Sequence, residues 1–309
     1  MASVRQIAQR VGVSTATVYR ALNNNPTDDP ETRRKVLVSL ARDKTAQETY
    51  TQFFARKGLR GVILRSFEES REVCAAIARE GFPAVVAADR FKEPEVNYIC
   101  CDSRDDSRRA VQHLIDLGHR RIALGMHAIR DTDHLDRKAG YEQAMLENGL
   151  AIDPSYEIEI LGSMEGGAGL ITRLMSLPVP PTAVFLTDPL ATVGALRRCL
   201  ELGIRVPADL SIVGFDDSDI RRHTYPMFSA VCQDAEMLGF ESARWLCRVL
   251  TDPDNEPGRS FRITRQTRLE INQSTGRPTE DPFRVLPDGT RTPVLAEDIP
   301  VVTVRRRTS

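Results

Sequence analysis

From residue 60 onward, short runs of β-branched and apolar residues alternate with longer stretches in which apolar residues recur every three or four positions. The first pattern is typical of strands buried on both faces, and the second of amphipathic helices. This alternation restricts the fold, because a strand reached through a helical crossover returns parallel to the strand before it. The sequence therefore predicts an α/β body with a doubly wound parallel sheet, which presents ligand-binding groups at the carboxyl ends of its strands. The expected strands are Gly61–Arg65, Ala84–Ala88, Tyr98–Cys101, Arg121–Leu124, Ile158–Leu161, Ala183–Leu186 and Leu210–Val213. The expected helices are Glu69–Glu80, Asp105–Leu117, Leu135–Asn148, Gly169–Met175 and Pro189–Leu202.

Ahead of this body, the sequence predicts three short helices. The first has one apolar stripe made of Val4, Ile7, Ala8 and Val11. Gly12 can adopt the positive φ of a tight turn, and the Ser14 hydroxyl can cap a second helix over Thr15–Asn23. Asp29-Pro30-Glu31 is a typical helix opening, with an N-cap, a proline and an acidic first turn. The buried side of this third helix would be Val36, Leu37 and Leu40.

Positive charge is concentrated in the same segment. Residues 1–44 carry eight lysines and arginines against four aspartates and glutamates, whereas the whole chain has a net charge of −1. A basic head on an acidic body is expected when only the head meets DNA phosphates. Three helices with a glycine turn between the first two form a helix-turn-helix, in which the second helix enters the major groove. An ordinary three-helix cap is the alternative that amphipathic helices alone leave open.

Specific motifs favour the DNA-binding interpretation. The segment IAQRVGVSTATVYRALNNNP resembles the head of the lactose/galactose repressor (LacI/GalR) family, although Val11 and Tyr19 stand where the family usually has alanine and serine. The segments AVQHLIDLGHRRIAL, DRKAGYEQAM and ELGIRVPADLSIVGFDDSDI resemble motifs in the body of the same family. The resemblance implies a transcription regulator, expected to be a repressor. It also implies a periplasmic-binding-protein-like core of two Rossmann-like lobes, with the chain crossing between the lobes near residues 125, 234 and 258.

The resemblance also assigns site residues. The DNA-binding residues would be Ser14, Thr15, Ala16, Thr17, Tyr19, Arg20 and Asn23, of which Thr15, Ala16 and Arg20 stand at base-reading positions. The effector-binding residues would be Asp102, Arg137, Thr187 and Asp216. Carboxylates accept hydrogen bonds from hydroxyls and an arginine donates from a rigid fork, so these residue types suit a sugar or a related metabolite. Two alternatives stay open: Asp216 or Asp217 caps the next helical turn, and Arg137 is a surface arginine at a helix start.

The expected partners are a roughly palindromic double-stranded DNA operator, a small-molecule effector and a second copy of the chain in a homodimer. We expect a cytoplasmic protein, because no apolar run reaches the ~18 residues of a membrane span and the N-terminus does not read as a signal peptide. No cofactor or metal is expected. The histidines lack H-x-x-x-H spacing, and the six cysteines form no C-x-x-C pair, which is typical of buried thiols.

The chief rival interpretation is an enzyme that uses a dinucleotide. GSMEGGAG at residues 162–169 follows an expected strand, and Asp188 lies at the distance at which a ribose-binding acid would be wanted. The glycines nevertheless lack the G-x-G-x-x-G spacing, and glycines in such a loop commonly serve a tight turn. We therefore expect no enzyme.

Two regions depart from the family pattern. After Lys44 the family continues with a hinge helix and a first βαβ unit, and roughly 60 residues of this kind have no counterpart here. The first lobe is then expected to be truncated with a bare sheet edge, and a degenerate member that binds DNA without effector control becomes the alternative function. At the other end, residues 278–309 contain five prolines and Arg305–Arg307, which predicts a flexible tail. The expected domains are a DNA-binding head (1–45), a two-lobed effector-binding and dimerisation core (46–277) and this tail.

Overall fold

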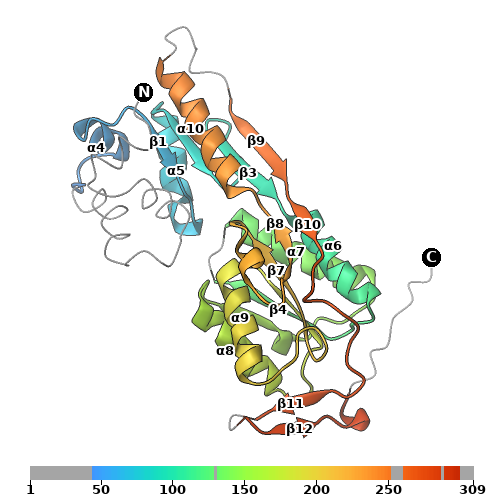
Figure 1. The fold of residues 1–309 in the computed structure, drawn as a ribbon. Helices are drawn as coiled ribbons and strands as arrows, with labels where there is room; N and C mark the ends of the chain where they lie inside the picture. The colour runs from blue at the N-terminus through green and yellow to red at the C-terminus, as the bar shows by residue number, and fades with distance from the viewer. Residues whose placement is uncertain (1–43, 129–130, 252–259, 287–288, 300–309) are drawn as a thin grey trace. The chain divides into compact units, whose positions relative to one another are not determined.

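The computed structural model describes residues 44–128, 131–251, 260–286 and 289–299. The predicted helix-turn-helix therefore lies almost wholly outside the described residues. The chain divides into two units, one formed by the chain up to Ile99 together with Met237–Arg262, and one formed by Cys100–Glu236 together with the chain from Ile263 onward (Figure 1). The first crossing thus follows Ile99, so the crossing expected near residue 125 is wrong. The physical reason is that the helix that follows Ile99 packs on another helix of the second unit. The chain has therefore already entered that unit before residue 125.

The first unit contains β1 and β2 of a four-stranded sheet in the order β1-β2-β3-β9, and the unit boundaries at Ile99 and Arg262 fall within β3 and β9. The strands of this sheet are β1 (Val62–Leu64), β2 (Ala84–Ala87), β3 (Tyr98–Asp102) and β9 (Arg262–Gln266). The helices of the first unit are α4 (Tyr50–Arg56), the short η1 (Glu68–Ser70), α5 (Arg71–Arg79) and α10 (Ala235–Thr251). β1, β2 and β3 are parallel, with Val62 opposite Ala84. Within the described chain no strand pairs with the outer side of β1, which is consistent with the expected bare edge.

Helix α4 is fixed by local and tertiary contacts together. Thr49 and Gln52 form a capping box at its start, and each side chain hydrogen-bonds the other residue's backbone N–H. Phe53 and Phe54 are buried and pack with Ile77 of α5 and Ala84 of β2. Two adjacent aromatic residues on such a short helix hold it firmly, since a seven-residue helix has little stability of its own.

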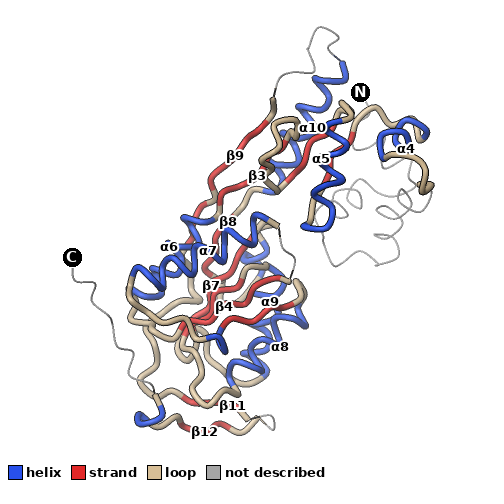
Figure 2. The backbone as a smooth tube through the Cα atoms, turned by 180° about the vertical axis from the view of Figure 1, so that it is seen from behind, coloured by secondary structure: helices blue, strands red, loops and turns tan. Residues whose placement is uncertain are grey.

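The second unit contains a six-stranded sheet in the order β10-β8-β7-β6-β4-β5 (Figure 2). Its strands are β4 (Ile122–His127), β5 (Glu157–Ile160), β6 (Ala183–Leu186), β7 (Ser211–Asp216), β8 (Ser229–Cys232) and β10 (Arg268–Glu270). Its α-helices are α6 (Arg104–Asp116), α7 (Thr132–Glu147), α8 (Met164–Met175) and α9 (Pro189–Glu201), and its 3-10 turns are η2 (Pro154–Tyr156), η3 (Ile220–His223) and η4 (Ala296–Asp298). All pairings are parallel except that of β10 with β8. All seven expected strands are present, whereas β8, β9, β10 and α10 were not among the expected elements.

Neighbouring residues of one strand enter different cores. In β4, Ile122 and Leu124 join the core under α6 and α7, whereas Ala123 joins the core under α8 and α9. In β6, Phe185 and Val184 divide in the same way. Both faces of the sheet are therefore covered by a helix pair, as the continuous apolar runs predict.

The glycine-rich stretch at residues 162–169 is the start of helix α8 and not a turn, because the helix begins at Met164 instead of the expected Gly169. The Ser163 hydroxyl caps it by accepting from the backbone N–H of Gly166 at 3.1 Å. A side chain on Gly167 would collide with the backbone of Ala191 in α9, so glycine is needed for the two helices to cross closely. The sequence motif that favoured a dinucleotide site is thus explained by helix packing.

The C-terminal region also differs from its prediction. β11 (Phe283–Val285) and β12 (Arg291–Pro293) pair antiparallel, where the sequence predicted a flexible tail. Phe283 and Val285 pack against the core under α8 and α9, and the Arg291 guanidinium lies 4.4 Å from the Phe283 ring centroid. The alternating apolar residues of β11 bury one face of this pair, and this outweighs the proline content that suggested disorder. Residues 300–309 lie outside the described residues.

Five of the six cysteines are buried, as their apolar surroundings predict, and Cys247 is exposed. No helix in the described part of the chain combines the length and apolar character that a membrane span requires.

His119 joins three segments at the base of the second unit and is almost completely buried. Its Nδ1 lies 2.8 Å from the Thr182 hydroxyl, and its Nε2 lies 3.1 Å from the Ser211 hydroxyl and 2.9 Å from the Gly276 carbonyl oxygen. Burial lowers the pKa of His119 to about 4, so the imidazole is neutral at pH 7. These contacts give His119 a structural role, because one side chain links three segments of the chain.

We predict that His119→Ala lowers the free energy of unfolding of the second unit by about 2–4 kcal/mol, because it leaves buried partners unpaired. The exposed His223 provides a matched control, and His223→Ala should change stability by less than about 0.5 kcal/mol. The wild type should also lose stability as the pH falls from 6.5 toward 4, because only the unfolded chain takes up the His119 proton in that range. Urea unfolding at several pH values checks both; a His119→Ala variant with unchanged stability and acid sensitivity would contradict the assignment.

Candidate effector site at the carboxyl ends of the second sheet

Polar side chains gather where the parallel strands of the second unit end. β4 ends at His127, β6 is followed by Thr187 and Asp188, and β7 ends at Asp216, with Asp217 next. Because the carboxyl ends of parallel strands meet at one edge of a sheet, these residues share an edge. This is the position at which the sequence predicted ligand-binding groups.

Two helices begin at this edge with aspartate caps. The Asp131 carboxylate accepts from the backbone N–H of His134 at the start of α7, at 2.9 Å. The Asp188 carboxylate accepts from the backbone N–H of Ala191 at the start of α9, also at 2.9 Å. The caps satisfy free N–H groups and interact favourably with the positive ends of the helix dipoles. The caps therefore hold both carboxylates in place at this edge.

Arg137 of α7 is at the centre of this edge and is only 5% exposed. Its Nη1 donates to the Thr187 carbonyl oxygen at 2.7 Å, and its guanidinium lies 3.4 Å from the centroid of the Phe215 ring. Its Nη2 is 3.7 Å from a carboxylate oxygen of Asp133. The Nε–H has no hydrogen-bond partner among the described residues. Arg137 is thus a rigidly held guanidinium with a donor to spare, and not the surface arginine of the alternative interpretation.

Thr187 and Asp102 have different surroundings. The Thr187 side chain is fully buried, and its hydroxyl accepts from the backbone N–H of His127 at 3.0 Å, which ties β6 to β4. Asp102 ends β3, and its carboxylate accepts from the backbone N–H of Arg104 at 3.1 Å at the start of α6. The structure therefore brings Arg137 and Thr187 into direct contact, whereas the contacts of Asp102 are with α6 and Thr267.

Asp216 is buried and its carboxylate is fully occupied. One oxygen accepts from the backbone N–H groups of Ser218 and Ile220, both at 3.2 Å. The other accepts from the backbone N–H of Arg221 at 3.3 Å and from its guanidinium at 2.7 Å. Arg221 is itself buried and also binds Glu270 at 2.6 Å. Four donors use all the acceptor positions of one carboxylate, so Asp216 caps η3 and neutralises Arg221.

Asp217 is in a different electrostatic environment. Burial raises its pKa to about 6, and the Asp216 and Asp188 carboxylates act in the same direction while Arg137 opposes them. Asp217 is therefore within electrostatic reach of Arg137 and Asp188 at the carboxyl edge. Sequence reasoning treated it only as an alternative cap. The signal that could have singled it out is the Asp-Asp pair after an apolar strand, because two adjacent carboxylates seldom serve one purpose.

Two histidines at this edge were also missed. The rings of His127 and His134 have centroids 5.0 Å apart, and His134 Nδ1 is 2.7 Å from an Asp131 oxygen. Burial lowers the pKa of His134 to about 4, with Arg137 acting in the same direction, and burial also lowers the pKa of His127. A side chain on Gly162 would collide with the His127 ring and the Asp188 carboxylate, so these two groups lie together beneath that loop. Neutral imidazoles beside a guanidinium and carboxylates offer both donors and acceptors, which suits a ligand rich in hydroxyl groups.

The predicted DNA-binding residues Ser14, Thr15, Ala16, Thr17, Tyr19, Arg20 and Asn23 lie outside the described residues. Within the described ranges, no three histidine, cysteine, aspartate or glutamate side chains are arranged as metal ligands.

Comparison with known proteins gives these observations a context. Residues 111–275, more than half of the chain, match the family described as periplasmic binding protein-like domain. The chain is 26% identical to the Probable HTH-type transcriptional repressor ExuR of Bacillus subtilis (strain 168) over 337 aligned residues, which cover 90% of this chain and 100% of that protein. It is 32% identical over 172 residues to the ribose operon repressor of Haemophilus influenzae, covering 56% of this chain and 52% of that protein.

A solved structure gives the same picture. A LacI family transcriptional regulator from Mycobacterium smegmatis superposes with a TM-score of 0.62 at 28% identity, over 85% of this chain and 94% of that chain. All three relatives are transcription regulators and none is an enzyme, which agrees with the expectation from sequence.

Substitutions at the adjacent Asp216 and Asp217 should change the free energy of unfolding in opposite directions. Asp216→Ala leaves the buried Arg221 without its principal partner and should cost about 3 kcal/mol. Asp217→Asn removes a carboxylate whose ionisation the fold disfavours, and should stabilise the protein by about 1–2 kcal/mol at pH 7. That gain should disappear below about pH 4, where Asp217 is protonated in both the folded and unfolded states. Chemical denaturation of both variants at pH 7 and pH 4 tests this, and a destabilised Asp217→Asn protein would refute it.

Proposed function

Because the chain belongs to the LacI/GalR family of transcription regulators, with a periplasmic binding protein-like domain as its core, we propose that it is a sequence-specific repressor that senses a hydroxyl-rich small molecule. The observation that carries the proposal is the helix-turn-helix string at residues 7–26, which precedes a core of this family. In this proposal the head occupies residues 1–45, and Thr15, Ala16 and Arg20 read bases in the major groove.

Several observations support the DNA-binding part. Positive charge is concentrated in residues 1–44, and the similar proteins named above are repressors and regulators. A single small head neutralises few phosphates, so we propose a cytoplasmic homodimer that binds two half-sites of a roughly palindromic operator.

For the effector we propose contacts from Arg137, Asp188 and Asp217. The Arg137 Nε–H is buried and has no hydrogen-bond partner in the part of the chain that the structure describes, and a ligand could satisfy such a donor. Asp217 takes the ligand-facing role first assigned to Asp216, because the Asp216 oxygens are occupied by four donors. Thr187 would contribute by holding Arg137 through its carbonyl oxygen. A sugar fits this set of donors and acceptors, and one similar protein is a ribose operon repressor.

We also propose that the first lobe lacks a hinge helix and one βαβ unit. The alignment with the Bacillus relative spans 337 residues and is longer than the 309-residue chain, so that relative contains segments that this chain lacks. The unpaired outer side of β1 is consistent with such a loss. A protein shortened in this way could bind its operator without effector control, and the ligand experiment below distinguishes the two cases.

Selection of bound fragments from random-sequence duplexes at a stated salt concentration should yield a two-fold symmetric site. On that site, Arg20→Ala should weaken binding about 10- to 100-fold and relax the sequence preference, because it removes a base contact. Arg42→Ala is the control outside the reading helix, and should weaken all duplexes by a small, uniform factor. Equal affinity of the wild type for every duplex would reject the proposal.

The effector contacts can be tested with D-ribose, D-glucose and D-glucuronate as probes in thermal-shift and calorimetric titrations. If one of them raises the melting temperature of the wild type, Asp217→Asn should abolish that rise while the protein itself becomes more stable. Stability and binding then change in opposite directions, which general damage to the fold cannot produce. An undiminished ligand response in Asp217→Asn would remove this residue from the site, and the absence of any response to a broad metabolite panel would favour regulation without an effector.

A further inference from the structure

Asn148 and Gly149 form the only Asn-Gly pair in the chain, and they lie where helix α7 ends. In such a pair the glycine nitrogen can attack the asparagine side-chain carbon, because glycine has no Cβ to hinder the approach. The Gly149 proton and the side-chain nitrogen leave together as ammonia, and water then opens the five-membered succinimide to aspartate or isoaspartate. The proposed effector site does not use this pair, because Arg137 belongs to the opposite half of the same helix.

The Asn148 side chain joins the end of α7 to the neighbouring helix α6, which lies beside it (Figure 2). Its Nδ2 donates to the Gln112 Oε1 at 2.7 Å and to the Ala144 carbonyl oxygen at 2.9 Å. In return the Gln112 Nε2 donates to the Asn148 Oδ1 at 3.4 Å, and it also donates to the Asp116 carboxylate at 2.8 Å. Since a carbonyl oxygen can only accept, these contacts require an amide at position 148.

The backbone at this end of α7 forms a Schellman turn. Gly149 has a φ of +66° and its N–H donates to the Leu146 carbonyl oxygen at 3.0 Å, while the Leu150 N–H donates to that of Met145 at 2.9 Å. Leu150 and Met145 are both buried in the core under α6 and α7. Asn148 has φ −96° and ψ 8°, a near-helical conformation that turns the next peptide nitrogen away from its side chain. Ring closure therefore requires this turn to open.

We propose that Asn148 is a latent deamidation site, which the Schellman turn and the Gln112 amide keep intact, and that its conversion to a carboxylate detaches the end of α7 from α6. A carboxylate cannot donate to the oxygens of Gln112 and Ala144, and it lies at the negative end of the helix dipole. It also shares the Gln112 amide with the Asp116 carboxylate. The reaction consumes only water, and it does not depend on binding of DNA or effector.

The deamidation rate tests the protection. Full-length protein is incubated at mildly alkaline pH, and mass spectrometry follows the amide-to-acid conversion in the peptide that contains Asn148. The reaction should be at least about tenfold slower in the folded protein than in the guanidinium-unfolded chain, because only the opened turn reacts. Gln112→Ala should accelerate it about threefold or more in the folded protein. Gln143→Ala is the matched control, because it removes an amide from the same helix pair without contacting Asn148, and should leave the rate unchanged.

Hydrogen exchange measures the same opening independently. In Gln112→Ala, the exchange rates of the Gly149 and Leu150 amides should rise by the same factor as the deamidation rate, because both reactions proceed from the opened turn. Exchange that rises while deamidation stays constant would contradict the proposed protection.

Thermal unfolding tests the consequence of the reaction. Asn148→Asp, which reproduces one product, should melt about 2–6 °C below the wild type. It should also melt below Asn148→Ala, which removes the amide without adding a charge at the helix end. Equal deamidation rates in folded and unfolded protein, an unchanged rate in Gln112→Ala, or an Asn148→Asp protein that is as stable as Asn148→Ala would each overturn the proposal.

Discussion

A parallel sheet must be covered on both faces, because its strands are joined by helices that pack back onto it and its apolar residues point both ways. In the second unit this constraint is met residue by residue: Ile122 and Leu124 of β4 face α6 and α7, while Ala123 faces α8 and α9. The position of the polar edge in this unit depends on this division of the strand residues between the two faces. The helix pairs on each side fix where the strands end, and the strand ends decide which polar side chains can meet.

The resulting polar edge contains several aspartates, and these aspartates have different roles in the structure. Asp131 and Asp188 cap helices, whereas Asp216 neutralises a buried arginine. Asp217 has none of these structural tasks, and its burial beside other carboxylates disfavours its charge. Groups whose charged form the fold disfavours commonly mark functional positions, because a bound ligand can supply the stabilising contacts that the fold does not provide. Arg137 lies at the same edge, and its Nε–H has no hydrogen-bond partner among the residues described.

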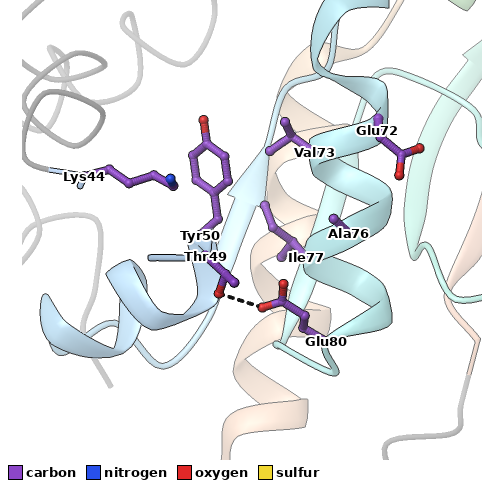
Figure 3. A pocket seen from close by; sticks show the side chains of 8 residues that line it. All are labelled: Lys44, Thr49, Tyr50, Glu72, Val73, Ala76, Ile77 and Glu80. Carbon is purple, nitrogen blue, oxygen red and sulfur yellow. Dashed lines mark hydrogen bonds between the residues drawn. The ribbon is translucent and has the colours of Figure 1, made fainter. Parts of the chain in front are cut away.

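The first unit is organised by a different balance. Its sheet is smaller, its first strand has three residues, and its short helix α4 depends on the burial of Phe53 and Phe54 for its position. Phe53 and Phe54 lie in the middle of α4, whereas Val73 and Ala76 of α5 remain partly exposed where they line a pocket (Figure 3).

The sequence alone was enough to predict seven of the strands, the helices between them and their order along the chain. All seven expected strands are present because continuous apolar runs fit a sheet that is covered on both faces. The effector-binding role of Asp102, Arg137, Thr187 and Asp216 stays a prediction. Local pattern failed where a distant contact decided the outcome. Residues 162–169 became a helix because Gly167 lets α8 approach α9, and Phe283 and Val285 became a strand because a core was available to bury them. The same reason separates Asp216 from Asp217: only the tertiary structure brings Arg221 to one of two chemically identical neighbours, since the energy of a buried charge depends on what surrounds it and not on its place in the chain.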